Sequence, residues 1–309
     1  MTLVMENSTT YHIPVMLSEC LEGLNINPDG IYVDLTFGGG GHARAIFNKL
    51  SENGLLIAFD QDPDAEKNAW KARNFKFVAS NFSFVSNHLK LMGIKKVDGI
   101  LADLGVSSHQ FDTEERGFSI RTNAKLDMRM NQSGELSAYT VINNYSEDEL
   151  ARIFKVYGEL KNARKLASVI AVEREKRSIK TTSELINVTT SCAPKFKEHK
   201  FYAQLFQALR IEVNQEINAL ERLLEQAAEI IRPGARLVIM SYHSLEDRLI
   251  KNYMKRGSFS GTITKDFFGN VLKPFTELNR HPIVPSEDEL SANSRARSAK
   301  LRIAERNEC

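Results

Sequence analysis

The chain has 309 residues, of which 42% are hydrophobic and 26% charged, and its formal net charge is +2. Such a composition predicts a globular protein with a sizeable core, and it contains no run of 18 apolar residues that would indicate a membrane span or a membrane partner. Cys20, Cys192 and Cys309 are too few and too far apart for a disulfide framework. Together with an N-terminus that lacks a secretory signal, they predict a cytoplasmic protein.

Short apolar runs in the first third of the chain predict buried strands over 31–37, 54–60, 75–80 and 98–105. The segments between them have apolar residues at helical spacing. Continuous apolar strands that alternate with helices are typical of a parallel sheet covered on both faces, and right-handed crossovers make it a doubly wound α/β sheet. In such a sheet the ligand crevice lies at the carboxyl ends of the strands.

The strand pattern stops after Leu104, and helix starts follow. Ser146-Glu-Asp-Glu149 and Thr181-Thr-Ser-Glu184 both have the spacing of a capping box. The pattern predicts helices over 146–157, 160–177, 182–192 and 202–231, then a strand over 235–242, a helix over 243–255 and a strand over 298–306. The segment 257–297 is expected to be the least structured. These elements predict a sheet domain in two parts, 1–108 and 214–309, with a helical insert over 109–213.

Four glycines follow the first strand in Ile31-Tyr-Val-Asp-Leu-Thr-Phe-Gly-Gly-Gly-Gly-His42. A P-loop would need Lys and then Ser or Thr after the last glycine, so that alternative is rejected. A dinucleotide-binding turn fits better, because Asp60 follows about 20 residues later and could bind ribose hydroxyls. A purely structural tight turn stays open.

Acidic residues at the strand ends favour a cationic ligand. Asp34 and Asp103 end the first and fourth strands, so we expect both to point into the crevice, where they would repel a pyrophosphate. S-adenosylmethionine has no phosphate, and its sulfonium and ammonium groups attract carboxylates. The sequence therefore favours this cofactor, with Asp60 on its ribose and Phe82 stacked on its adenine. Each acid taken alone is also compatible with a solvated strand end.

Nine blocks spread over nearly the whole chain resemble one known family. They are HIPVML (12–17), DLTFGGGGH (34–42), AFDQDP (58–63), DGILADLGVSS (98–108), ERGFSIR (115–121), LDMRM (126–130), FQALRIEVNQEI (206–217), SYHSLEDRLIK (241–251) and RARSAKLRIAER (295–306). The chain resembles the bacterial ribosomal RNA small subunit methyltransferase H family, also called MraW, which methylates N4 of a cytidine in the decoding region of 16S rRNA. The resemblance implies a Rossmann-like, S-adenosylmethionine-dependent methyltransferase sheet with an inserted all-helical substrate domain, acting on the small ribosomal subunit.

Matched by position, the resemblance implies cofactor contacts by Gly40, Gly41, His42, Asp60, Phe82, Asp103 and Gln110. Four positions depart from the family pattern. His109 stands where proline is expected, Gly39 where arginine is common, and Gln204-Leu205 where an Arg-Thr pair is expected. The last difference removes a candidate phosphate contact.

Methylation of an exocyclic amine requires alignment of nitrogen, methyl carbon and sulfur, together with acceptors for the amine hydrogens. We expect Asp103 to orient the target amine or the cofactor. His243 and Ser244 are further catalytic candidates, with His243 as a proton shuttle. A helix-capping Ser244 beside a hydrogen-bonded His243 is equally compatible with the sequence.

The target base has to be presented out of its stack. Arg116, Phe118, Asp127 and Arg129 could form its pocket, or they could form a loop held by Arg–Asp pairs. Basic clusters at 161–165, 174–177, 195–200 and 295–300 are expected to follow the RNA backbone.

Two other functions stay open if the resemblance is set aside. One is an NAD(P)-dependent oxidoreductase, and the other is a non-catalytic RNA-binding or ribosome assembly factor. No metal site is expected from the sequence.

Overall fold

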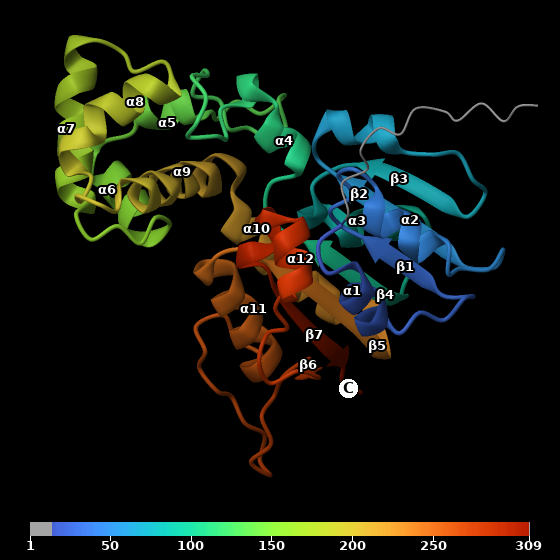
Figure 1. The fold of residues 1–309 in the computed structure, drawn as a ribbon. Coiled ribbons are helices and arrows are strands. Elements are labelled where there is room, and N and C mark those ends of the chain that lie inside the picture. The colour runs from blue at the N-terminus through green and yellow to red at the C-terminus, as the bar shows by residue number, and fades with distance from the viewer. Residues whose placement is uncertain (1–13, 309) are drawn as a thin grey trace, which may run out of the picture.

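The computed structural model describes residues 14–308 and contains a seven-stranded sheet of order β3-β2-β1-β4-β5-β7-β6 (Figure 1). The strands are β1 (Ile31–Asp34), β2 (Leu55–Asp60), β3 (Phe75–Ala79), β4 (Val97–Asp103), β5 (Ile231–Ser241), β6 (Phe275–Glu277) and β7 (Lys300–Arg306). All pairs from β3 to β5 are parallel, and β7 and β6 join antiparallel. The expected Rossmann-like α/β sheet is confirmed. The start of the HIPVML block lies outside the described residues.

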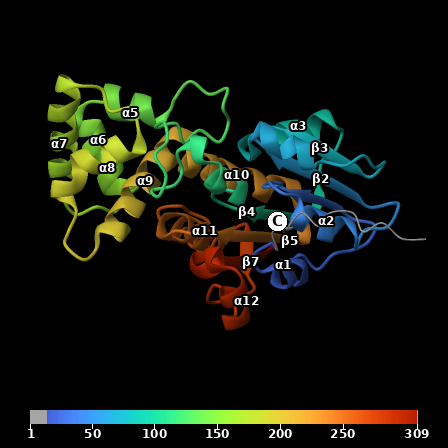
Figure 2. The same cartoon turned by 45° about the horizontal axis from the view of Figure 1, so that its top comes forward.

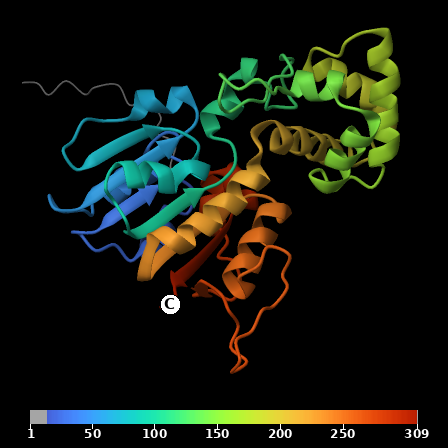
Figure 3. The same ribbon diagram turned by 180° about the vertical axis from the view of Figure 1, so that it is seen from behind.

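Helices bury both faces of this sheet. Helices α1 (Leu17–Leu24) and α2 (Gly41–Phe47) pack on the face that presents Tyr32 and Leu56. The opposite face, seen from behind in Figure 3, is covered by α3 (Val85–Leu91), α10 (Glu216–Ile230) and α11 (Ser244–Arg256). Since successive strand residues point to opposite faces, two buried faces explain why the strands are apolar throughout.

A second hydrophobic core lies to one side of the sheet, within the helical segment, residues 109–213 (Figure 2). Its helices are α4 (Ser108–Asp112), α5 (Ala138–Asn144), α6 (Glu147–Val156), α7 (Ala163–Lys176), α8 (Thr182–Thr189) and α9 (Glu198–Asn214). Both expected capping boxes are present, at the starts of α6 and α8. They satisfy amide groups that a helix start otherwise leaves unpaired.

The expectation of one helix over 202–231 is wrong. Helix α9 ends at Asn214, and α10 begins at Glu216. Gln215 between them has φ +52°, a left-handed conformation that ends an α-helix. Leu209 on α9 packs in the core of the helical segment, whereas Leu223 on α10 packs under the sheet. The turn at one residue lets two consecutive helices serve two separate cores.

The C-terminal third contains more structure than expected. Strand β5 begins at Ile231, which pairs with Val97, so the Pro-Gly pair at 233–234 lies within the strand. The segment 257–297 holds strand β6, helix α12 (Glu287–Ala292) and a bridge between Lys265 and Val271. Within residues 14–308, no helix combines the length and the apolar character that crossing a bilayer requires.

Candidate active site

A cavity of about 760 Å³ opens at the carboxyl ends of β1, β2 and β4. Its lining comes from the loop after β1, the ends of β2 and β4, the start of the helical segment, and the starts of α10 and α11. Of the predicted cofactor residues, the cavity is lined by Gly41, His42, Asp60, Phe82, Asp103 and Gln110. This is the position expected for the ligand crevice of a doubly wound sheet.

The glycine loop bends because two of its glycines occupy conformations or spaces that other residues do not tolerate. Gly40 has φ +77°, and its N–H donates to the carbonyl of Phe37 at 2.7 Å. A Cβ on Gly41 would lie 2.3 Å from Cγ of Pro14. Gly40 therefore supports the loop from outside the cavity lining, while Gly41 brings the backbone to the cavity wall.

Asp60 ties the glycine loop to the end of β2. Its Oδ2 accepts from the N–H of Gly38 at 2.7 Å, and its Oδ1 accepts from the N–H of Asp62 at 2.8 Å. Burial raises the pKa of Asp60 to about 6. No cationic side chain pairs with it in the described part of the chain, so its charge is available to a ligand in the cavity.

Asp103 lies where the glycine-loop side of the cavity meets β5. Its backbone N–H donates to Thr36 Oγ1 at 2.6 Å, and its Oδ1 accepts from the Tyr242 hydroxyl at 2.8 Å. Burial and the Asp103 carboxylate raise the pKa of Tyr242, so the phenol keeps its proton and remains the donor. Tyr242 is not among the residues predicted for the site, although it lies in the SYHSLED block.

Asp34 does not point into the cavity as expected. It is 1% exposed and absent from the lining, its Oδ1 accepts from the N–H of Thr36, and its Oδ2 has no hydrogen-bond partner within residues 14–308. Burial raises its pKa to about 6. The carboxylate that precedes the glycines thus lies behind the loop, whereas the next two residues, Leu35 and Thr36, line the cavity.

His42 and Gln110 hold the cavity wall through buried hydrogen bonds. His42 Nε2 lies 3.0 Å from the carbonyl of Val15, which can only accept, so this nitrogen carries the proton. Its Nδ1 lies 3.9 Å from Asp103 Oδ2, and burial lowers the pKa of His42. Gln110 donates to Asp62 Oδ2 at 2.6 Å and closes the capping box of α4 with Ser107.

The four residues predicted to surround the target base are engaged with one another or with the core. Arg116, only 4% exposed, pairs with Asp62 at 3.0 Å and donates to the carbonyls of Arg129 and Met130. Arg129 forms a two-point pair with Asp127. Phe118 is buried in the core of the helical segment. None of the four lines the cavity, which favours the alternative of a loop held by Arg–Asp pairs.

The two predicted residues after β5 begin helix α11. His243 is the N-cap, and its Nδ1 accepts from the N–H of Glu246 at 3.5 Å. Ser244 is exposed and donates to Glu159 Oε2 at 2.7 Å. Neither residue lines the cavity, whereas Tyr242 and Glu246 on either side of them do.

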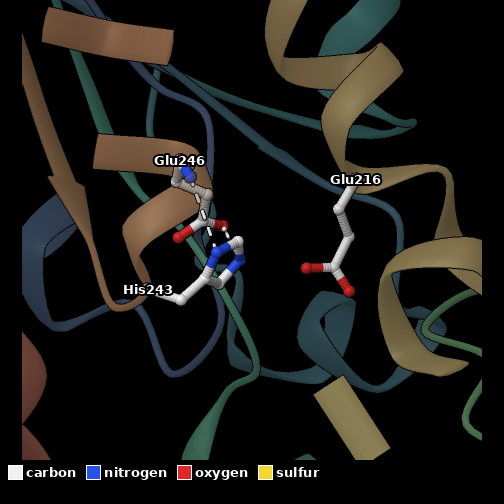
Figure 4. Close-up of side chains that lie close together, drawn as sticks. All are labelled: Glu216, His243 and Glu246. Carbon is white, nitrogen blue, oxygen red and sulfur yellow. Dashed lines mark hydrogen bonds and ion pairs between the residues drawn. The ribbon is translucent and has the colours of Figure 1, made fainter. Parts of the chain in front are cut away.

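A cluster of buried charges closes the cavity near these residues. Arg210 donates to both carboxylate oxygens of Glu216, at 2.9 and 3.0 Å. One ligand atom from each of Glu216, His243 and Glu246 lies within 4.8 Å of the other two. Figure 4 shows His243 and Glu246 in contact, with the Glu216 carboxylate turned toward them. The sequence pattern did not reveal this cluster, because Arg210 and Glu216 lie on either side of a helix break that the pattern does not predict.

The spacing of this cluster would suit a divalent cation, but its hydrogen bonds oppose one. His243 uses the Nδ1 lone pair to cap α11, so in the neutral ring its proton is on Nε2, which faces Glu246 at 3.2 Å. A metal would need that Nε2 lone pair and would compete with Arg210 for Glu216. The guanidinium already supplies the positive charge that the carboxylates require.

The cavity wall fits a cationic donor better than a diphosphate. Along the glycine-loop side, Asp60 and Asp103 face the cavity, and the nearby guanidinium of Arg116 is neutralised by Asp62. A pyrophosphate in this place would meet carboxylates with no free arginine among the described residues of that side. The expected NAD(P)-dependent alternative is therefore disfavoured on electrostatic grounds.

A family model described as the MraW methylase family matches residues 9–307. The chain belongs to the MraW methylase family. As a family member it is a methyltransferase with S-adenosylmethionine as cofactor, and the carboxylates, glycine loop and Phe82 of the cavity fit that donor.

Two curated relatives show how far the similarity extends. A protein from Bacteroides fragilis named ribosomal RNA small subunit methyltransferase H is 54% identical over 301 residues, which cover 97% of this chain and 99% of the relative. A protein of the same name from Flavobacterium johnsoniae is 53% identical over 306 residues, which cover 99% and 100%. The crystal structure of an rRNA methylase from Streptococcus thermophilus covers 94% of each chain with 12% identity and a TM-score of 0.37.

Proposed function

We propose that this MraW family protein methylates N4 of a cytidine in the decoding region of 16S rRNA, within the small ribosomal subunit. The relatives named ribosomal RNA small subunit methyltransferase H support rRNA as the substrate. The observation that carries the proposal is the place of Asp103. It lines the cavity between the glycine loop, which it meets at Thr36 and His42, and Tyr242 at the end of β5.

On the cofactor side, we assign each lining residue a part in binding S-adenosylmethionine. Asp60 accepts hydrogen bonds from the ribose hydroxyls, and Phe82 stacks on the adenine. Gly41 allows close backbone approach, and His42 and Gln110 keep the wall in place. Asp34 and Gly40 act from behind the lining by holding the loop.

At the reacting end, the cofactor supplies an electrophilic methyl group, and the protein has to orient the amine toward it. The lone pair of a cytosine N4 is delocalised into the ring, so the protein must accept the amine hydrogens as positive charge develops on nitrogen. Asp103 does this with a carboxylate that Tyr242 fixes through its hydroxyl at 2.8 Å. In this proposal His243 and Ser244 act as a helix cap and a surface contact, and neither takes the proton.

The helical segment 109–213 is the proposed substrate-recognition domain. Lys161, Arg164 and Lys165 line a small surface pocket, are exposed, and have no ion-pair partner among the described residues. By contrast, Lys176 and Arg177 pair with Glu173 and Glu184. The cluster 161–165 is therefore the stronger candidate for contact with RNA phosphates.

The experiment that tests the proposal is methyl transfer from labelled S-adenosylmethionine to small subunits that lack the modification, followed by nucleoside analysis. We expect the label in N4-methylcytidine. Label at carbon 5 of cytidine or in adenosine would overturn the assignment. Transfer to free 16S rRNA at the same rate would overturn the requirement for the assembled subunit.

A further inference from the structure

The buried charges at the far wall of the cavity have no part in binding the methyl donor as assigned above. They are Arg210, Glu216 and Glu246, which all line the cavity, with Tyr242 between them and Asp103. Charged groups are rarely buried unless they are paired or bind a ligand. The side chains of Arg210 and Glu216 are 16% and 10% exposed, and that of Glu246 is 4% exposed.

The hydrogen bonds of this cluster leave specific atoms for a ligand. Arg210 uses Nε and Nη2 on Glu216, while its Nη1 has no hydrogen bond within the described residues. Glu246 Oε2 accepts from the N–H of Tyr242 at 3.2 Å, and its Oε1 lies 3.2 Å from His243 Nε2. Each carboxylate oxygen has a second lone pair. The wall therefore presents several acceptors beside one guanidinium donor.

The carboxyl group of Glu246 remains an ionised acceptor in this cluster. Burial opposes ionisation of Glu246, but the neighbouring His243 and Arg210 outweigh it and keep the pKa of this carboxyl below its usual range. Two carboxylates therefore present acceptors, with the guanidinium of Arg210 and the imidazole of His243 beside them. A ligand with hydrogen-bond donors is attracted to such a wall, whereas a carbonyl oxygen or phosphate facing it is repelled.

We infer that Arg210, Glu216 and Glu246 form the site that receives the Watson–Crick edge of the target cytosine. This edge combines one amine hydrogen on N4, which a carboxylate of the cluster accepts, with the N3 and O2 acceptors, to which Arg210 donates. The other amine hydrogen, on the C5 side, is left for Asp103. Uracil has an oxygen in place of the amine, and that oxygen would face the carboxylates. The inference rests on the proposed cytidine-N4 activity and adds the residues that select cytosine over uracil.

The geometry links this site to the break between α9 and α10. Arg210 lies one turn before the end of α9, and Glu216 is the first residue of α10. The left-handed Gln215 brings the two side chains together across the turn. In a continuous helix, residues six positions apart would point in different directions. His243 acts as a positioning residue, since its Nε2 lies 3.2 Å from Glu246 Oε1 and it does not itself line the cavity.

The test uses Glu216→Gln, which keeps the shape but loses the charge, with Arg210→Lys as a second variant. Glu225→Gln is the matched control, because it makes the same charge change at an exposed position of the same helix. We expect kcat on unmodified subunits to fall at least about 100-fold in Glu216→Gln, with affinity for S-adenosylmethionine changed less than about threefold. The control should match the wild type.

A second readout separates recognition from a merely structural role. Subunits assembled with uridine at the target position serve as competitive inhibitors, and the wild type should bind them about 10-fold or more weakly than cytidine subunits. The glutamine amide can donate to O4 of uracil, so in Glu216→Gln this ratio should fall toward one. Arg210→Lys should also reduce it, because lysine cannot hold Glu216 and the base at once.

Two outcomes would overturn the inference. One is a folded Glu216→Gln variant with wild-type kcat, KM and cytidine preference. If the wild-type protein forms N4-methylcytidine in the same assay, the proposed function stands and only the inference fails. The other is calorimetric binding of Mn²⁺ by the wild type that Glu216→Gln abolishes, which would make the cluster a metal site.

Discussion

The glycine-loop side of the cavity and the neighbouring loop 116–130 use their charged residues in opposite ways. On the glycine-loop side, Asp60 has only backbone N–H donors as partners and faces the cavity. In the loop 116–130, Arg116 pairs with Asp62 and Arg129 with Asp127. Charged side chains that pair with each other hold the loop in place. A charged side chain without such a pair is available to a ligand. Sequence motifs contain both kinds, so the motif alone does not distinguish them.

The variant Arg116→Ala should show the largest effect, a loss of stability that tests whether Arg116 holds the loop. Removing one partner of a buried ion pair leaves the other charge unpaired, and we expect a loss of about 3–5 kcal/mol in the free energy of unfolding. Chemical denaturation measures it, with Arg121→Ala, an exposed residue of the same loop, as control. Unchanged stability together with a raised KM would return Arg116 to the base pocket.

Next in size is the effect of Asp103→Asn on turnover. Loss of a preorganised acceptor at the reacting end should lower kcat about 10²–10³-fold, because an amide accepts less strongly from a developing cation. Steady-state methyl transfer measures this, and the circular dichroism spectrum should be unchanged. Asp98→Asn, at the opposite end of β4, should leave kcat intact. Near-normal turnover of Asp103→Asn would remove it from the chemistry.

Smaller effects are expected from the pH, first on the stability of the protein and then on cofactor binding. Burial raises the pKa of Asp60 from 3.8 to about 6, so between these values the ligand-free folded protein holds a proton that the unfolded chain has lost. The stability of the ligand-free protein therefore falls as the pH rises through that window. Asp34, whose pKa is also raised to about 6, lowers the stability over the same window.

The cofactor should bind the ionised form of Asp60, so its affinity should rise as the pH passes 6. We expect about a 10-fold gain between about pH 5 and 7 by calorimetry, because the raised pKa withholds the charge at the lower pH. In Asp60→Asn this dependence should largely disappear. An affinity that falls with rising pH would contradict the assignment.

The smallest expected effect is that of Ser244→Ala. Its hydroxyl makes one exposed hydrogen bond to Glu159, so the variant should lose at most about 1 kcal/mol of stability and turn over at the wild-type rate. Thermal unfolding and methyl transfer measure the two quantities. A turnover rate lowered by an order of magnitude or more would restore Ser244 as a catalytic residue.

Much of the fold could be predicted because local patterns determine it. Buried parallel strands require continuous apolar runs, and the capping boxes of α6 and α8 act within four residues. The break at Gln215 could not be predicted. No glycine or proline marks it, and it exists because Leu209 and Leu223 belong to different cores.

The site was harder to predict than the fold, because it depends on the direction in which side chains point and on ion pairs between residues far apart in the sequence. Asp34 ends a strand as expected, yet its side chain lies behind the loop. Arg116 meets Asp62 across 54 positions of the chain. Residues whose motif signal was weak, such as Glu216 and Tyr242, face the cavity instead.

The single-residue joint at Gln215 gives the helical segment a lever arm. Helix α9 has 17 residues, which at about 1.5 Å each make it roughly 25 Å long. A swing of about 10° at this joint would carry the far tip of α9 by roughly 4 Å, while the first turn of α10 stays seated on the sheet. Because Arg210 lies on α9 and Glu216 on α10, such a swing would also change the distance between these two side chains.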